Sequence, residues 1–495
     1  MKKRKFKDWF KNKNELIIFL ISFFIALTFF LWQRRFFSWD FSVYMMNAEY
    51  ALGLGNGYGN YFEWLRPPFV PFLLMIFRPL GRTFAAYFFV IFSTSLYFFS
   101  LKLFHDKFLK NIDNSWIFYI FAINPFVLGY GLGIGTELIS LSLIILFVVF
   151  SFSPVGFVFL GLSILTRYSN AILFPLVFLS KNIKKILMGF VIILMVFLPW
   201  FFINYVFTGH FFTSVGDYYA LNSLEQAPAK FDLWLLSYHL LLALNACLPF
   251  LILGIFKKNK NERKNKELFI IMISIVILTL LMYSINSIKE PRFLFNLALP
   301  ACYFSVLGFN SIEKLKGEKR TIVKTVLIIF LLVLSLFTFV FAENTSKGFI
   351  GEEEMTKQII KKTDNCTIAS DLWIYFNWYG KKAIPAPMAL NLVETNEPEI
   401  FSMIDQGYNI ILFKNSESFT KNKNFVEDLK NYLVEDNEKY IWLRNKEKCK
   451  IDEKINRTYI DSLKPFGEFS KDFSGCDALM TRLNLRKVCE MFKFL

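Results

Sequence analysis

Long apolar runs separated by short polar segments fill roughly the first two-thirds of the chain. There are about eleven of these runs, and most approach the roughly 20 residues that a helix needs to cross the hydrocarbon core of a bilayer. The pattern therefore predicts a mainly α, polytopic helical membrane protein. The expected spans are residues 15–32, 83–104, 115–133, 137–152, 154–166, 168–180, 186–207, 233–256, 268–287, 293–312 and 325–342.

The first apolar run, residues 15–32, has the basic N-terminal flank of a signal peptide. It is long enough to span a membrane, however, and no small-residue cleavage site follows it. The polar sequence Gln33-Arg34-Arg35 follows instead. We therefore expect an uncleaved anchor helix with its N-terminus in the cytoplasm.

The distribution of Lys and Arg decides how the short runs 154–166 and 168–180 are counted. They are either two short helices on the two sides of Arg167 or one long span. With two helices, the segments assigned to the cytoplasm hold 24 Lys and Arg residues and the opposite loops hold nine, as the positive-inside rule requires. A single span would place the strongly basic segment 257–267 outside. We therefore expect two helices, in a multi-pass protein of the cell membrane.

The composition changes near Glu343. From there to Leu495, polar and charged residues dominate, and helix-like stretches alternate with strand-like ones. Such alternation is typical of a small α/β domain. We expect a transmembrane module at 1–342 and a soluble domain at 343–495, which the number of spans places outside the cytoplasm. The helix-like stretches are 352–363, 396–406 and 424–434, and the strand-like ones are 367–370, 410–413 and 440–444.

Four of the six cysteines fall in this C-terminal domain: Cys366, Cys449, Cys476 and Cys489. They allow up to two disulfides, and all three possible pairings stay open. The chain has no CxxC pair and no Cys/His cluster, so we expect no structural zinc site.

The composition agrees with a membrane protein. Hydrophobic residues make up 55% of the chain, charged residues 19%, and the mean hydropathy is +0.41. These values exclude a disordered, fibrous or small disulfide-stabilised protein. The net charge of +16 would suggest nucleic acid binding in a soluble protein. Here basic cytoplasmic loops explain it, and we expect no nucleic acid partner.

The first external segment, residues 33–82, is longer than the other early loops but is not hydrophilic. An amphipathic stretch follows Asp40, glycines at 53, 55, 57 and 59 interrupt it, and Arg66-Pro67-Pro68 opens a second apolar stretch. We expect helices that lie at the membrane surface rather than crossing it.

Ionisable residues at or near membrane depth are rare and often functional. In the predicted topology, five of them meet one face of the membrane: Asp40, Arg66, Glu137, Arg167 and Arg292. Each also has an ordinary interpretation. Asp40 can cap a helix, Glu137 can complement a helix dipole, Arg167 can reach the interface, and Arg292 can pair with Glu290.

As a set, the five residues suit one chemistry. The planar fork of Arg binds a phosphate ester through two charged hydrogen bonds. A carboxylate can remove a proton from the hydroxyl or amine of an acceptor. The combination indicates group transfer from a lipid-linked phosphate.

The order of these motifs resembles the glycosyltransferase C superfamily, in particular the protein mannosyltransferase and aminoarabinose transferase type. The likeness covers roughly residues 1–342. Its motifs are Asp40, Tyr44, Ala48 and Ala51, the glycines of 53–59, Arg66-Pro67-Pro68 with Pro71, Asn124-Pro125, Glu137, Gly161-Leu162 through Leu165-Thr166-Arg167, and Arg292-Phe293 with Pro300.

The resemblance implies a polyprenyl-phosphate sugar donor that is used on the outer side of the membrane. Asp40 would act as the base or organise the site, and Glu137 would be the second acid. The three arginines would hold the lipid phosphate and stabilise it as it leaves. Tyr44 and Tyr61 are further substrate-binding candidates. Glu137 stands where some relatives have Asp, and a bound divalent cation stays open.

The sequence thus predicts a membrane glycosyltransferase that moves one sugar to an extracytoplasmic lipid, glycan or protein. Direct displacement at the anomeric carbon predicts inversion. Two alternatives remain: a non-catalytic transporter or flippase of lipid-linked sugar, and an assembly factor of the cell envelope. A transporter would favour internal repeats with broken helices, and the sequence has no evident repeat of that kind.

Overall fold

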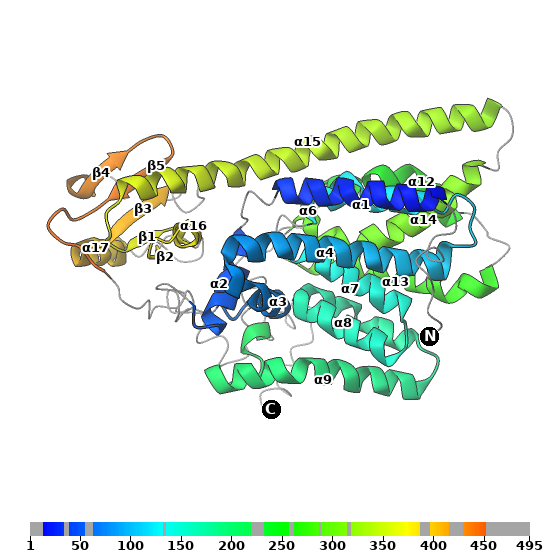
Figure 1. The fold of residues 1–495 in the computed structure, drawn as a ribbon, viewed down its shortest axis with the longest axis horizontal. Coiled ribbons are helices and arrows are strands. Elements are labelled where there is room, and N and C mark those ends of the chain that lie inside the picture. The colour runs from blue at the N-terminus through cyan, green and yellow to red at the C-terminus, as the bar shows by residue number, and fades with distance from the viewer. Residues whose placement is uncertain are drawn as a thin grey trace.

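The structure is a computed structural model in which most helices form a bundle, with a small sheet beyond one end of it (Figure 1). It confirms the predicted fold class, a mainly α protein with a sheet near its C-terminus. The described residues are 13–33, 39–54, 63–131, 135–216, 218, 232–256, 262–286, 289–313, 318–386, 397–414 and 429–451.

Long and short helices pack side by side in the bundle (Figure 1). The α-helices are α1 (Lys13–Gln33), α4 (Arg82–Phe104), α5 (Ile117–Ala122), α6 (Pro125–Tyr130), α7 (Glu137–Val149), α8 (Pro154–Thr166), α9 (Ile183–Thr208), α11 (Leu233–Leu244), α12 (Leu248–Phe256), α13 (Glu262–Ile285) and α14 (Ala298–Glu313). Tighter or wider turns form η2 (Arg78–Leu80), η3 (His105–Leu109), η4 (Tyr168–Leu179), η5 (Asn245–Cys247) and η6 (Pro291–Leu297).

Helices α12 and α14 approach each other closely, and two glycines permit this. A Cβ atom at Gly254 would lie 1.9 Å from the carbonyl oxygen of Phe304, and one at Gly308 would lie 1.8 Å from that of Phe250. Backbones that pack this tightly leave no room for a side chain. Any other residue at either position would push the two helices apart.

By length and composition, five described helical segments can cross a membrane, which makes the chain a multi-pass membrane protein. They are Lys13–Trp32, Arg82–Leu109, Ile183–Thr208, Lys266–Ile285 and Pro291–Ile312. The bent pair α11 and α12 makes a sixth if it is one broken span. The described chain also holds four shorter apolar helices, Phe69–Leu80, Glu137–Val149, Pro154–Thr166 and Tyr168–Leu179.

Four of the predicted spans, 115–133, 168–180, 233–256 and 293–312, are not single regular α-helices. The run 115–133 breaks at Asn124, whose side chain accepts a hydrogen bond from the N–H of Val127 at 3.0 Å and so caps α6. Pro125 follows as the first residue of α6, a position where its missing N–H costs nothing. The run 168–180 is a 3₁₀-helix, η4, with Pro175 inside it.

The short runs on the two sides of Arg167 are separate elements, as the Lys and Arg distribution predicted. Arg167 itself is extended, with φ −148° and ψ 112°, and it pairs with Glu137 at the start of α7. At the other end of α7, Lys107 donates a hydrogen bond to the carbonyl of Val149. The basic segment 102–110 and Arg167 therefore lie at opposite ends of the bundle.

Two short helices occupy the first predicted external segment, α2 (Trp39–Ala51) and α3 (Phe69–Phe77). Residues 41–49 of α2 are all buried. The helix packs on α3 and also on α16 (Trp373–Trp378) from the C-terminal part of the chain. The position of α2 and α3 at the membrane interface stays a prediction.

A buried carboxylate fixes the far end of α2. Glu49 is 1% exposed and pairs with Arg78 at 2.5 Å and with Arg82 at 2.7 Å. Arg82 also donates to the carbonyl oxygens of Asn377 and Trp378 at 3.2 and 2.9 Å. One guanidinium thus joins α2, the start of α4 and the end of α16.

The helix α15 (Glu318–Lys362) runs without a break from the bundle to the sheet (Figure 1). The boundary predicted at 342/343 therefore falls inside a helix. The sheet has the strand order β2-β1-β3-β5-β4, in which β1 is parallel to β2 and β3, and β5 is antiparallel to β3 and β4. The strands are β1 (Ile368–Ser370), β2 (Ala383–Pro385), β3 (Asn409–Phe413), β4 (Leu433–Asp436) and β5 (Tyr440–Leu443).

Alternate residues of β3 face the two sides of the sheet. Ile411 and Phe413 belong to the core that includes residues of α2, α15 and α16. Ile410 and Leu412 pack against α17 (Glu397–Gln406) on the other side. Strands β1, β3 and β5 and helix α17 were predicted, whereas β2 and β4 were not. The predicted stretch 424–434 lies partly outside the described residues, and its described part holds η7 (Lys430–Tyr432) and the start of β4.

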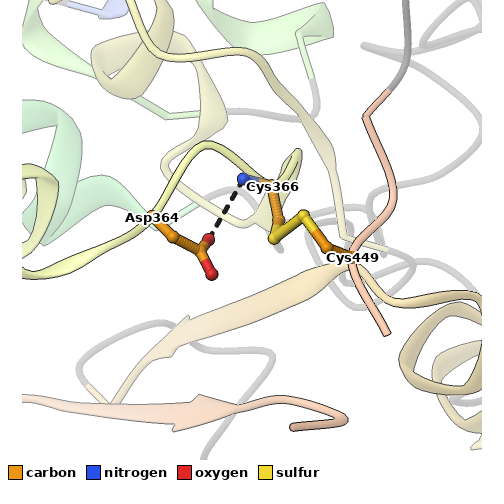
Figure 2. A group of neighbouring side chains, drawn as sticks. All are labelled: Asp364, Cys366 and Cys449. Atoms are coloured by element: carbon orange, nitrogen blue, oxygen red, sulfur yellow. Dashed lines mark hydrogen bonds between the residues drawn. A yellow bond between two sulfur atoms is a disulfide. The ribbon is translucent and has the colours of Figure 1, made fainter. Parts of the chain in front are cut away.

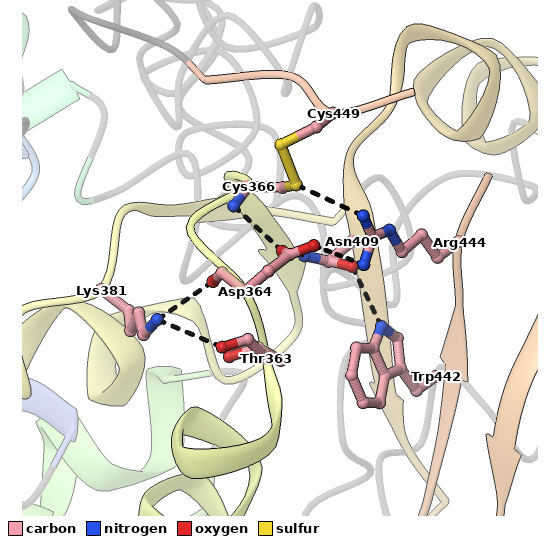
Figure 3. Close-up of a disulfide and its surroundings, with 8 residues drawn as sticks. All are labelled: Thr363, Asp364, Cys366, Lys381, Asn409, Trp442, Arg444 and Cys449. Carbon is pink, nitrogen blue, oxygen red and sulfur yellow. Dashed lines mark hydrogen bonds and ion pairs between the residues drawn. A yellow bond between two sulfur atoms is a disulfide. The ribbon is translucent and has the colours of Figure 1, made fainter. Parts of the chain in front are cut away.

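One disulfide joins Cys366, just before β1, to Cys449, beyond β5 (Figure 2). Asp364 supports it by accepting a hydrogen bond from the N–H of Cys366 at 3.0 Å and by pairing with Arg444 (Figure 3). This is one of the pairings that the sequence left open. Cys476 and Cys489 lie outside the described residues.

Replacing either cysteine of this disulfide is expected to destabilise the sheet. The bond spans 83 residues, and removing such a cross-link from a small domain costs about 2–5 kcal/mol. We expect Cys366→Ser, Cys449→Ser and the double variant to lower the unfolding temperature in detergent by the same amount, because each removes the same bond. Unequal effects, or an unchanged temperature in all three, would contradict a disulfide between these two residues.

Candidate functional site

The five ionisable residues singled out in the sequence come from five different parts of the fold. Each stands at or beside the end of a helix. Asp40 is the second residue of α2, Arg66 precedes α3, Glu137 opens α7, Arg167 links α8 to η4, and Arg292 is the second residue of η6.

The structure brings all five side chains to one cavity of about 180 Å³. The cavity lies at the end of α7 away from the basic segment 102–110. Three arginines and two carboxylates give the lining a net positive charge. The other lining residues are Tyr44, Leu65, Pro67, Thr136, Tyr168, Ser169, Tyr218 and Phe293.

Asp40 is held between two guanidinium groups. Its Oδ1 lies 2.6 Å from Nη1 of Arg66, and its Oδ2 lies 2.9 Å from Nη1 of Arg292. The side chain of Asp40 is 16% exposed. These contacts join α2, the segment before α3 and η6, although 252 residues separate Asp40 from Arg292.

Glu137 is almost fully buried and pairs with Arg167. Its other oxygen accepts hydrogen bonds from the N–H and hydroxyl of Thr136 at 3.2 and 3.3 Å. A carboxylate can be buried so deeply only when it is paired and hydrogen-bonded. The guanidinium of Arg167, 12% exposed, is thereby fixed at the cavity wall.

Each of the two arginines beside Asp40 has a second acidic partner. Arg66 Nε lies 2.9 Å from Glu63, and Arg292 Nε lies 2.5 Å from Glu290. The backbone of Glu63 is tied to α2, since its N–H donates to the Asn47 side chain at 2.9 Å and its carbonyl accepts from the same amide at 3.1 Å.

One wall of the cavity is aromatic. The hydroxyl of Tyr168 accepts a hydrogen bond from the indole of Trp200 at 2.8 Å and lies 2.5 Å from Ser214 Oγ. The rings of Tyr168 and Tyr218 are 5.3 Å apart. The guanidinium of Arg66 lies 5.9 Å from the centre of the Tyr44 ring, so this predicted residue does line the site. Tyr61 lies outside the described residues.

Burial and charge act in opposite directions on the pKa of Asp40. Burial alone raises it, but the two arginines outweigh burial and hold the pKa below its usual value of 3.8. Burial raises the pKa of Glu63 despite the contact with Arg66. Burial likewise raises the pKa of the Tyr44 hydroxyl. Asp40 is therefore an ionised carboxylate at neutral pH, and Tyr44 is a neutral phenol.

The sequence did not single out Glu63, Thr136 or Tyr168 as site residues. Thr136 and Tyr168 are chain neighbours of Glu137 and Arg167, so the motif positions themselves pointed to them. Glu63 carried a weaker signal, an acid three residues before Arg66.

Two groups of three potential metal ligands occur among the described residues, and neither lies at the cavity. Asp364, Cys366 and Cys449 form the first group. Both of its sulfur atoms are joined in the disulfide (Figure 2), so neither is available as a thiolate ligand.

The second group consists of Glu15, His105 and Asp106, near the basic end of the bundle. The ammonium group of Lys102 lies 3.3 Å from Glu15 and also pairs with Asp106. A lysine already supplies the positive charge that a metal ion would bring. The question of a divalent cation near Glu137 stays open.

No protein-family model and no curated protein matches the sequence. Two solved structures share the fold. One is ArnT from Cupriavidus metallidurans bound to undecaprenyl phosphate, with 11% identity, a TM-score of 0.53, and coverage of 87% of this chain and 97% of that one. The other is the same protein in the apo state, with 12% identity, a TM-score of 0.52, and coverage of 87% and 96%.

The likeness shows that this chain shares the fold of ArnT, in agreement with the resemblance seen in the sequence. The two comparisons cover most of both chains, so the likeness includes the helical bundle. At 11–12% identity it carries the fold alone.

The ion pairs of Asp40 make the stability of the chain depend on pH. The lowered pKa means that these pairs stabilise the fold above the unfolded value of 3.8, and that this contribution is lost as the pH falls below it. We expect Asp40→Asn to cost about 3 kcal/mol at neutral pH. The gap in unfolding temperature between wild type and variant should then shrink between neutral pH and the acid range. A gap that does not change with pH would contradict this assignment.

Proposed function

We propose that the chain is a membrane glycosyltransferase, which transfers a sugar from a polyprenyl-phosphate donor to an acceptor outside the cytoplasm. The observation that carries the proposal is the meeting of three arginines and two carboxylates at one cavity. This set can bind a phosphate and accept a proton at the same place.

The donor class follows from the cavity and from its position in the bundle. Guanidinium groups bind phosphate through paired, charged hydrogen bonds. The bundle is that of a membrane protein, so a phosphate attached to a lipid reaches the cavity along the bilayer. One structural neighbour was solved with undecaprenyl phosphate bound, which supports a polyprenyl-phosphate donor for this chain.

In the proposed reaction, an oxygen or nitrogen of the acceptor attacks the anomeric carbon of the sugar. The bond between that carbon and the phosphate oxygen breaks, and its electron pair leaves with the polyprenyl phosphate. Asp40 receives the proton of the acceptor. Arg66, Arg167 and Arg292 stabilise the negative charge that builds up on the phosphate. Because displacement is direct, the configuration at the anomeric carbon inverts.

The orientation in the membrane follows from the same geometry. The basic segment 102–110 lies at the end of the bundle away from the cavity, and basic loops favour the cytoplasmic side. We place the N-terminus in the cytoplasm, and the cavity and the C-terminal sheet outside. The acceptor is then a lipid, glycan or protein of the cell envelope.

A transporter of lipid-linked sugar could use the same arginines, and an envelope assembly factor could use the C-terminal sheet. Neither needs a carboxylate such as Asp40 between two arginines. Release of free polyprenyl phosphate that depends on an added acceptor distinguishes the enzyme from both alternatives.

Removing the two cavity carboxylates tests the assigned roles. With a lipid-phosphate sugar as donor, we expect Asp40→Asn to lower turnover by about a hundredfold or more, because the proton acceptor is lost. We expect Glu137→Gln to lower it by about tenfold, because Arg167 loses a charged partner. Glu354→Gln, an exposed acid on α15, is the matched control and should retain activity. Unchanged turnover in both cavity variants would remove the proposed roles.

A further inference from the structure

Every arginine of the cavity already carries a carboxylate. Arg167 holds Glu137, Arg66 holds Asp40 and Glu63, and Arg292 holds Asp40 and Glu290. The four carboxylates outnumber the three guanidinium groups, so each positive charge that the donor phosphate would need is already compensated. A phosphate that enters the cavity must therefore compete with an acid for at least some of these contacts.

Arg66 and Arg292 each contact Asp40 and a second acid. Glu63 accepts a hydrogen bond from Arg66 Nε, whereas Glu290 is 41% exposed and makes only an ion-pair contact with Arg292 Nε. Each uses Nη1 for Asp40, at 2.6 and 2.9 Å, and Nε for a second acid, Glu63 at 2.9 Å and Glu290 at 2.5 Å. Asp40 lines the cavity, whereas neither Glu63 nor Glu290 does. A ligand in the cavity can therefore take the place of Asp40 on the Nη groups, while the Nε contacts with Glu63 and Glu290, outside the cavity lining, persist.

We propose that the donor phosphate replaces Asp40 on the Nη groups of Arg66 and Arg292. Glu63 and Glu290 are positioning residues that hold both guanidinium groups in place during this exchange. Asp40 then becomes an effective proton acceptor only after the donor has bound. The inference rests on the proposed function and adds an order to it, in which binding of the donor switches on the base.

The electrostatics favour this order. In the structure both oxygens of Asp40 face a cation, which makes the carboxylate a weak base. Loss of these contacts and the arrival of an anionic phosphate both favour the protonated form of Asp40. Asp40 is surrounded by other charged or titratable groups. These are Tyr44 on its own helix, Glu63 and Arg66 before α3, Glu137 and Arg167, Glu290 and Arg292, and Tyr375 of α16.

The position of Glu63 suits a residue that must not move. It is 3% exposed, and two hydrogen bonds tie its backbone to Asn47 in the middle of α2. Arg66 is therefore anchored to the same helix that carries Asp40. When Asp40 releases Arg66, the guanidinium keeps its place through Glu63.

Proton uptake on binding is the direct test. The probe is undecaprenyl methyl phosphate, a phosphodiester that does not itself titrate at mildly acidic pH. Calorimetry of the full-length protein in detergent, in two buffers of different ionisation enthalpy, measures protons taken up per ligand bound. At mildly acidic pH, below the range in which Asp40 acts as the base, we expect uptake with wild type and none with Asp40→Asn, while both bind the probe.

The outcomes separate the inference from the function on which it rests. Binding without uptake, or equal uptake in Asp40→Asn, overturns the exchange and leaves the proposed function standing. Failure of the wild type to bind the probe overturns the proposed function, and the inference with it.

The positioning role has its own readout. With Glu63→Gln, Arg66 is no longer held by a charge at Nε and stays with Asp40. We expect the KM for the donor to rise about tenfold, with kcat within a factor of about two and with less proton uptake on binding the probe. Glu63→Asp should restore part of the affinity, and Glu354→Gln should behave as wild type. A fall in kcat with unchanged KM would contradict the role given to Glu63.

Discussion

Pairing of charges at one end of an apolar bundle is the constraint on which the rest of this structure depends. A carboxylate or guanidinium removed from water costs several kcal/mol unless an opposite charge and hydrogen bonds compensate for it. Asp40, Glu49 and Glu137 all lie at this end of the bundle, and each is paired with at least one arginine. The pairs of Asp40 and Glu49 tie α2 to the starts of η6 and α4, and the pair of Glu137 ties the start of α7 to the end of α8. The same contacts that make the fold possible therefore assemble the cavity.

Much of the site could be read from the sequence because charges are conspicuous in an apolar chain. Asp40, Glu137 and the three arginines stand out against runs that contain almost no other ionisable residue. Glu63 does not, because an acid three residues before Arg66 is explained by a local ion pair. Its importance depends on burial and on the contact with Asn47, which only the folded chain provides.

The fold was predictable to a similar degree, and for a similar reason. Apolar length and the distribution of Lys and Arg identify helices and separate α8 from η4. The break at Asn124 is a local event in which a cap and a proline outweigh the apolar run around them. Strands β2 (Ala-Ile-Pro) and β4 (Leu-Val-Glu-Asp) are the two edges of the sheet, and they contain Pro, Glu and Asp, which are depleted in strands.

The continuous helix α15 has a mechanical consequence. Its 45 residues correspond to a rod about 68 Å long, more than twice the roughly 30 Å thickness of a bilayer's hydrocarbon core. A flexible tether would let the sheet drift, whereas a rod fixes both its height and its rotation. Each residue inserted into α15 would rotate the sheet about the helix axis by about 100°. Such a rotation would break the contact between α16 and α2. The number of residues in α15 therefore sets both the distance of the sheet from the bundle and the direction in which the sheet faces.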